Sequence, residues 1–86
     1  MRQIWVVDDD RSIRWVLEKA LTRAQMPFRL FESAADVVKA FERDTPSVLL
    51  SDIRMHDMSG LDLLAFVKNK YPGLPVIIMT AFSDLD

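Results

Sequence analysis

The chain lacks cysteine and has only one histidine, and each of these features excludes a class of site. It has no cysteine among its 86 residues, so neither a disulfide framework nor a thiolate metal site is available. Its single histidine, His56, cannot build a zinc site alone. The longest uncharged apolar stretch, near residues 76–82, is too short to span a bilayer. We therefore expect no disulfide, no zinc centre and no membrane partner.

A dominant charge of one sign is also missing. The formal net charge is −2, half of the residues are apolar and 28% are charged, which is typical of a folded domain. We expect a single domain over residues 1–86 and no direct nucleic-acid partner. The first apolar run ends at Asp8, too early for the core of a secretory signal, so a cytoplasmic location is expected.

Short β-branched runs alternate with helical segments, which predicts a parallel α/β sheet. We expect strands at 4–8, 28–31, 48–52 and 75–80. Ser33 and Ser59 each precede an aspartate by three residues, a spacing that predicts a capped helix start. Trp5 and Trp15 are interpreted as packing residues. The first helix should be one-sided, because six apolar residues follow the spacing of one helical face: Ile13, Val16, Leu17, Ala20, Leu21 and Ala24.

Acidic residues follow two of the predicted strands. Asp8, Asp9 and Asp10 come directly after the first strand, and Asp52 comes at the end of the third. Because parallel strands end on the same edge of a sheet, these carboxylates should converge, and like charges at close range need a cation. Mg²⁺ prefers such oxygen ligands and keeps waters for a phosphate. The pattern indicates phosphoryl chemistry, with one carboxylate left as a nucleophile.

A simpler interpretation needs no ligand. The acids at 8–10 stand just before a predicted helix, where a carboxylate satisfies free backbone N–H groups and favours the helix dipole. Asp52 alone could be a turn residue, and Thr80 a structural threonine at a strand end. His56 is interpreted as a solvated loop residue.

Three stretches together resemble a known family. WVVDDDRSIRWVLEKAL, LLSDIRM and LPVIIMTAFSDLD are similar to the receiver domain of two-component response regulators, and closer still to that of the NtrC-type, sigma-54-dependent activators of nitrogen regulation. The resemblance implies a flavodoxin-like sheet of order 2-1-3-4-5 with the site at the carboxyl ends of the strands. This chain would supply about three and a half βα units, with strand order 2-1-3-4.

The same resemblance implies roles for individual residues. Asp52 matches the phosphoacceptor, and Thr80 matches the hydroxyl residue that contacts the phosphoryl group. The implied Mg²⁺ ligands are Asp8, Asp9, Asp52 and the backbone carbonyl of Arg54, with Asp10 as the alternative if the register shifts. The phosphoryl donor would be a sensor histidine kinase. The domain would be a phosphoprotein that regulates transcription and not an enzyme in its own right.

The chain departs from the family pattern in several places. The fifth strand, its phosphoryl-binding lysine, the aromatic switch residue and the last two helices would lie beyond residue 86, so phosphorylation of Asp52 is expected to be impaired. His56 stands where proline is typical. Gln25 stands where glycine often ends the first helix, because a left-handed backbone commonly caps a helix at that position.

Two other functions compete with this one. An apolar strand ending in Asp8-x-Asp10, with Thr80 after a later strand, also resembles haloacid-dehalogenase-like phosphotransferases, but that reading leaves Asp52 unexplained. Alternatively, the chain is a truncated or engineered fragment that self-associates without signalling. In that case a homodimer would complete the sheet, through the edge of the fourth strand or by exchange of a C-terminal segment.

Overall fold

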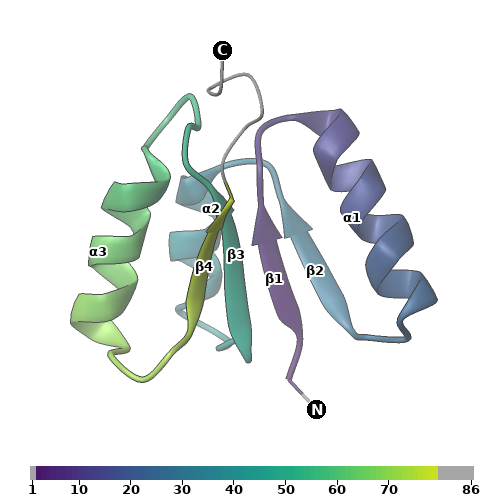
Figure 1. The fold of residues 1–86 in the computed structure, drawn as a ribbon. Coiled ribbons are helices and arrows are strands. Elements are labelled where there is room, and N and C mark those ends of the chain that lie inside the picture. Colours follow the sequence, from purple (N-terminus) through teal and green to yellow (C-terminus); the bar gives the residue numbers. More distant parts are fainter. Residues whose placement is uncertain (1, 80–86) are drawn as a thin grey trace.

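The computed structural model describes residues 2–79, which form a four-stranded sheet flanked by three helices (Figure 1). All strand pairs are parallel, and the strand order is β2-β1-β3-β4, as predicted. The elements alternate along the chain: β1 (Ile4–Val7), α1 (Arg11–Arg23), β2 (Phe28–Phe31), α2 (Ala34–Ala40), β3 (Val48–Asp52), α3 (Gly60–Lys70) and β4 (Val76–Met79).

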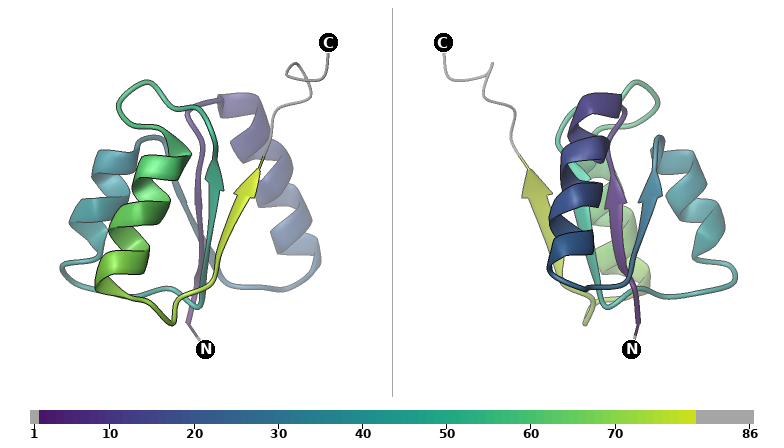
Figure 2. Two further views of the ribbon diagram at one scale, coloured as in Figure 1. Left: turned by 60° about the vertical axis from the view of Figure 1, so that its left-hand side comes forward. Right: turned by 90° about the vertical axis from the view of Figure 1, so that its right-hand side faces the viewer.

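The helices lie on both faces of the sheet. Helix α1 covers one face, and α2 and α3 cover the other (Figure 2). Because the strands are parallel, their carboxyl ends lie along one edge, and the register places Val7 beside both Phe31 and Ser51. No helix within residues 2–79 combines the length and the apolar character that crossing a bilayer requires.

The main core lies between the sheet and the α2/α3 layer. Its centre is Trp5, whose ring lies 5.1 Å from that of Phe31 and 5.0 Å from that of Phe41. Helices α2 and α3 contribute apolar residues with no solvent exposure at all. Removing apolar surface from water in a close-packed core is the main source of stability in a small domain. The buried cluster comprises Trp5, Val7, Phe31, Ala34, Val37, Ala40, Phe41, Leu49, Leu63, Val67 and Leu74.

The α1 face is covered much more thinly. No residue of α1 is buried, although its apolar stripe was predicted from the sequence. Val16 is 54% exposed, and Ile77 on β4 is 53% exposed. The interpretation of Trp15 as a packing residue is wrong: the residue is 59% exposed, and its ring lies under the ammonium group of Lys19. Trp15 faces solvent, and a cation covers one side of its ring.

The helix ends follow local chemistry that the sequence predicts. The hydroxyls of Ser33 and Ser59 each accept a hydrogen bond from the backbone N–H three residues later, which confirms both caps. Gln25 has φ of 58°, so the residue that follows the C-cap of α1, Ala24, adopts the left-handed backbone that usually selects glycine. Strand β1 ends one residue earlier than predicted and β4 begins one residue later, and Thr80 lies outside the described residues.

Candidate functional site

Three carboxylates meet at the carboxyl edge of the sheet. Asp8 and Asp9 follow β1, and Asp52 is the last residue of β3. Each offers an oxygen atom, and these three oxygens lie within 4.8 Å of one another. They meet because β1 and β3 are neighbours in register, so the residues that follow Val7 stand beside those that follow Ser51. We call Asp8, Asp9 and Asp52 the acidic cluster.

Burial and neighbouring negative charges both act on the carboxyl group of Asp8. Its side chain is only 3% exposed, and burial raises the pKa of its carboxyl group above the ordinary value of 3.8. A hydrogen bond from the backbone N–H of Asp10, 2.8 Å long, opposes that rise in the pKa. The negative charges of Asp52, Asp9 and Asp10 raise the pKa further. Close, partly buried carboxylate oxygens of this kind fit a hard cation such as Mg²⁺.

Asp10 has a different task. Its Oδ1 atom accepts hydrogen bonds from the backbone N–H groups of Ser12, at 2.8 Å, and Ile13, at 3.4 Å. Asp10 is therefore the N-cap of α1, and the capping interpretation applies to it. Asp8 and Asp9, in contrast, belong to the acidic cluster.

The roles predicted for two other residues, Arg54 and Thr80, remain predictions. Arg54 lies two residues beyond Asp52, in the loop that connects β3 to α3, where its backbone carbonyl was assigned to the metal by resemblance. Thr80, assigned to the phosphoryl group, is outside the described residues.

The end of β3 is held in place by a close approach of backbones. The N–H of Gly60 donates to the carbonyl of Ile53 over 2.7 Å. A Cβ atom at residue 60 would lie 2.1 Å from the carbonyl oxygen of Asp52, a distance that no side chain tolerates. Only glycine therefore lets α3 begin here, and the sequence signal was a glycine at the first position of a predicted helix.

Sequence reasoning missed two contacts to the cluster. Arg14, one turn into α1, donates from Nη1 to the backbone carbonyl of Asp8 over 2.6 Å, and its Nη2 lies 3.9 Å from the carboxylate of Glu32. The backbone N–H of His56 donates to Oδ2 of Asp9 over 3.0 Å, with Nδ1 of the ring 3.5 Å from the same oxygen. The His56 side chain is 68% exposed, as expected for a solvated residue, but its backbone N–H binds a carboxylate of the cluster.

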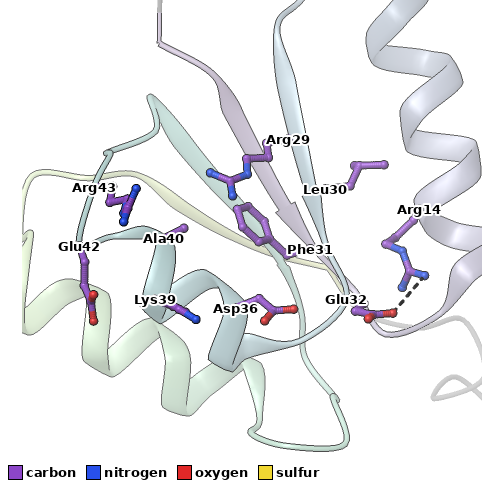
Figure 3. Close-up of a pocket in the computed structure, with 10 residues that line it drawn as sticks. All are labelled: Arg14, Arg29, Leu30, Phe31, Glu32, Asp36, Lys39, Ala40, Glu42 and Arg43. Atoms are coloured by element: carbon purple, nitrogen blue, oxygen red, sulfur yellow. Dashed lines mark ion pairs between the residues drawn. The ribbon is translucent and has the colours of Figure 1, made fainter.

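A hollow of about 620 Å³ lies beside β2 and α2, and none of the three cluster residues lines it (Figure 3). Charges of both signs line it, and the Arg14–Glu32 pair closes one side. This mixture indicates no single ligand chemistry. Its lining residues are Arg14, Arg29, Leu30, Phe31, Glu32, Asp36, Lys39, Ala40, Glu42 and Arg43.

Comparisons with known proteins agree with this geometry. The family model of the response regulator receiver domain matches residues 4–86. The DNA-binding transcriptional regulator NtrC of Proteus hauseri is 66% identical over 83 residues, and that of Escherichia coli K12 is 60% identical. Both alignments cover 96% of this chain and 18% of the relative, so the chain spans less than a fifth of the length of these regulators.

Solved structures show the same fold. The apo receiver domain of NtrC is 58% identical with a TM-score of 0.83, and the match covers 99% of this chain and 68% of that one. The response regulator TrrA of Thermotoga maritima, in complex with Mg²⁺ and a beryllium fluoride, is 28% identical with a TM-score of 0.89, covering 98% and 73%. The family model, the flavodoxin-like strand order and the acidic cluster agree, and the chain belongs to the response regulator receiver domain family.

Proposed function

We propose that this receiver domain is a phosphoacceptor and that Asp52 takes the phosphoryl group. The observation that carries the proposal is the acidic cluster, in which Asp52 lies beside two further carboxylates at the carboxyl edge of the sheet. The cluster also favours this role over the haloacid-dehalogenase-like alternative. That alternative needs Asp10 beside Asp8, but the carboxylate of Asp10 caps α1.

Mg²⁺ would be held by the carboxylates of the acidic cluster and by the backbone carbonyl of Arg54. When bound, the ion supplies positive charge that neutralises and aligns an incoming phosphoryl group. The raised pKa of Asp8 supports the proposal, because the cluster is costly to ionise and a divalent cation removes that cost.

The chain's own groups orient the reaction. Oδ1 of Asp52 accepts a hydrogen bond of 2.9 Å from the N–H of Ile53, which fixes the plane of the carboxylate. A carboxylate oxygen of Asp52 would form the bond to phosphorus as the bond between phosphorus and the donor breaks, leaving an aspartyl phosphate. The hydroxyl of Thr80 would hydrogen-bond the transferred group.

The partner and setting follow from the similarity to NtrC. We propose that a sensor histidine kinase donates the phosphoryl group, that the domain acts in the cytoplasm, and that it serves nitrogen-dependent control of transcription. The support is the 66% and 60% identity to the receiver segments of two NtrC proteins.

Binding of a phosphoryl mimic tests the proposal. With Mg²⁺ and beryllofluoride, fluorine NMR should show a bound resonance in the wild type and none in Asp52→Asn. Asp44→Asn is the matched control, because Asp44 is an exposed aspartate near the opposite, amino-terminal end of β3. Equal mimic binding by Asp52→Asn and the wild type would refute Asp52 as the acceptor.

We also propose that the 86-residue chain forms a homodimer through β4. Strand β4 pairs only with β3 in the described sheet, and Ile77 exposes an apolar side chain beside that open edge. Unpaired edges template pairing with another strand, and twofold pairing of two β4 strands closes both edges. Exchange of a C-terminal segment would produce the same mass.

Light scattering at micromolar concentration tests assembly. We expect a dimer for the wild type and a monomer for Ile77→Lys, because a lysine on an edge strand opposes pairing. Leu61→Lys is the control, since Leu61 on α3 is similarly exposed. A wild-type monomer of 9.9 kDa would contradict the proposal. A dimer that survives Ile77→Lys would favour segment exchange.

A further inference from the structure

The loop of residues 53–59, between β3 and α3, contacts a helix that is distant in sequence. The carboxylate of Asp57 accepts two hydrogen bonds from the start of α2: Oδ1 from the N–H of Ala34 at 3.3 Å, and Oδ2 from the N–H of Ala35 at 2.9 Å. The contact spans 22 and 23 residues of sequence. Asp57 thus ties the loop that carries Arg54 to α2.

These bonds complete the cap of α2. The hydroxyl of Ser33 accepts from the N–H of Asp36, and Asp57 takes the two N–H groups that Ser33 does not reach. Partial desolvation raises the pKa of Asp57, but the N–H groups of Ala35, Ala34 and Asp57 itself, with the nearby His56, outweigh it. The net shift of the pKa is downward from 3.8, so the carboxylate is charged at neutral pH.

The residue beside Asp57 contacts the acidic cluster. His56 donates its backbone N–H to Asp9 over 3.0 Å, so two consecutive residues link Asp9 to the first turn of α2. A second link runs the other way around, from the carbonyl of Asp8 to Arg14 and on to Glu32, which directly precedes Ser33. Two separate chains of contacts therefore connect the acidic cluster to the start of α2.

We propose that Asp57 is a positioning residue for the acidic cluster, which holds the β3–α3 loop against α2 and thereby sets Mg²⁺ affinity. The proposal deepens the proposed function and rests on it. Without the two bonds to Ala34 and Ala35, the middle of the loop loses its attachment to α2, and the His56 bond to Asp9 beside it is weakened. Coupling between sites is reciprocal, so Mg²⁺ binding should also change the environment of the backbone amides at the start of α2.

A purely structural role for Asp57 predicts something different. A cap that only stabilises α2 would lower the free energy of unfolding, by about 1 kcal/mol for a typical cap. It would leave unchanged both the Mg²⁺ affinity of the folded protein and the rate at which the His56 amide exchanges with solvent. The test therefore needs readouts at the cluster and not only a stability measurement.

The experiment compares Asp57→Ala with Asp44→Ala, which removes an exposed aspartate that accepts a hydrogen bond from the backbone N–H of its neighbour Thr45. Mg²⁺ is titrated while amide resonances are followed by NMR. We expect Asp57→Ala to bind Mg²⁺ on the order of tenfold more weakly and Asp44→Ala to match the wild type. In the wild type, the amides of Ala34 and Ala35 should shift with the same midpoint as that of Asp9.

A metal-free measurement separates this inference from the proposed function. In Asp57→Ala, the His56 amide should exchange with solvent on the order of tenfold faster, because the loop no longer holds it on Asp9. If the wild type binds no Mg²⁺, the proposed function fails, and exchange at His56 still decides whether Asp57 holds the loop. Unchanged His56 exchange, or unchanged Mg²⁺ affinity, overturns the inference. If Asp57→Ala does not fold, Asp57→Asn, which keeps one acceptor oxygen, should show an intermediate loss of affinity.

Discussion

The two faces of the sheet use the same four strands in different ways. On the α2/α3 face, Trp5, Val7 and Leu49 point into a core that helices close completely. On the α1 face, Val6 is buried, yet Ile77 and every residue of α1 retain contact with solvent. Figure 2 shows the single helix opposite the pair. The α2/α3 face therefore supplies most of the packing energy within the described residues.

Helix α1 is instead anchored through the functional edge. Asp10 caps its first turn, and Arg14 donates to the carbonyl of Asp8. Both contacts lie beside the acidic cluster, so hydrogen bonds at the site help to hold the helix that has no buried residue. On the opposite face, α3 reaches the site through its backbone, because Gly60 lies against the end of β3.

The largest expected effect compares the two faces directly. Leu63→Ala on α3 should lower the free energy of unfolding by about 3 kcal/mol, because a fully buried leucine leaves a cavity. Val16→Ala on α1 should cost less than about 1 kcal/mol, since its side chain is already half exposed. Urea denaturation measures both. Equal losses would show that α1 packs as tightly as α3 and would break the comparison.

A smaller effect is expected where α3 begins. Gly60→Ala should cost about 2 kcal/mol, because the new Cβ atom displaces the carbonyl of Asp52 and the helix must shift. Gly73→Ala is the matched control: nothing lies within 4 Å of its Cβ position, so stability should change by less than about 0.5 kcal/mol. Thermal unfolding of the pair gives the answer, and a harmless Gly60→Ala would disprove the close approach.

The smallest effect concerns Asp8 and has the opposite sign. The pKa of Asp8 is raised above 3.8 in the folded state. The contribution of this carboxyl group to stability is therefore fully present below pH 3.8 and is lost as the pH rises through the folded pKa. Asp8→Asn should therefore stabilise the metal-free protein at pH 7 by about 0.5–1 kcal/mol.

Two controls sharpen the Asp8 prediction. The gain should disappear near pH 3, where Asp8 is protonated in both states, and it should shrink when Mg²⁺ stabilises the wild type. Urea denaturation at the two pH values measures the difference. A loss of stability in Asp8→Asn at pH 7 would mean that the backbone bond from Asp10 outweighs burial and like charge.

Much of the fold was predictable because its causes are local. Strand alternation and helix periodicity predicted all seven elements, and capping spacings located the starts of α2 and α3. The approach of Asp52 to the acids after β1 was also predictable, since parallel strands share one carboxyl edge, but Asp10 was expected there too and instead caps α1. Their roles in metal binding and phosphoryl transfer remain predictions.

Other features were not predictable because they depend on segments distant in sequence. The periodicity of α1 indicates which side is apolar but not how completely the sheet covers it, so the exposure of Trp15 was missed. Asp57 is unremarkable in sequence, and nothing local reveals that its carboxylate reaches Ala34 and Ala35.

Periodicity, capping and strand direction act within a few residues, so they set the elements and the edge at which the acids meet, whereas the strand order was expected from the family resemblance. The tertiary structure alone decided which carboxylate caps and which joins the cluster, why residue 60 must be glycine, and how the β3–α3 loop is tied to α2. These outcomes depend on distances between separate elements, and such distances are set only when the helices pack on the sheet.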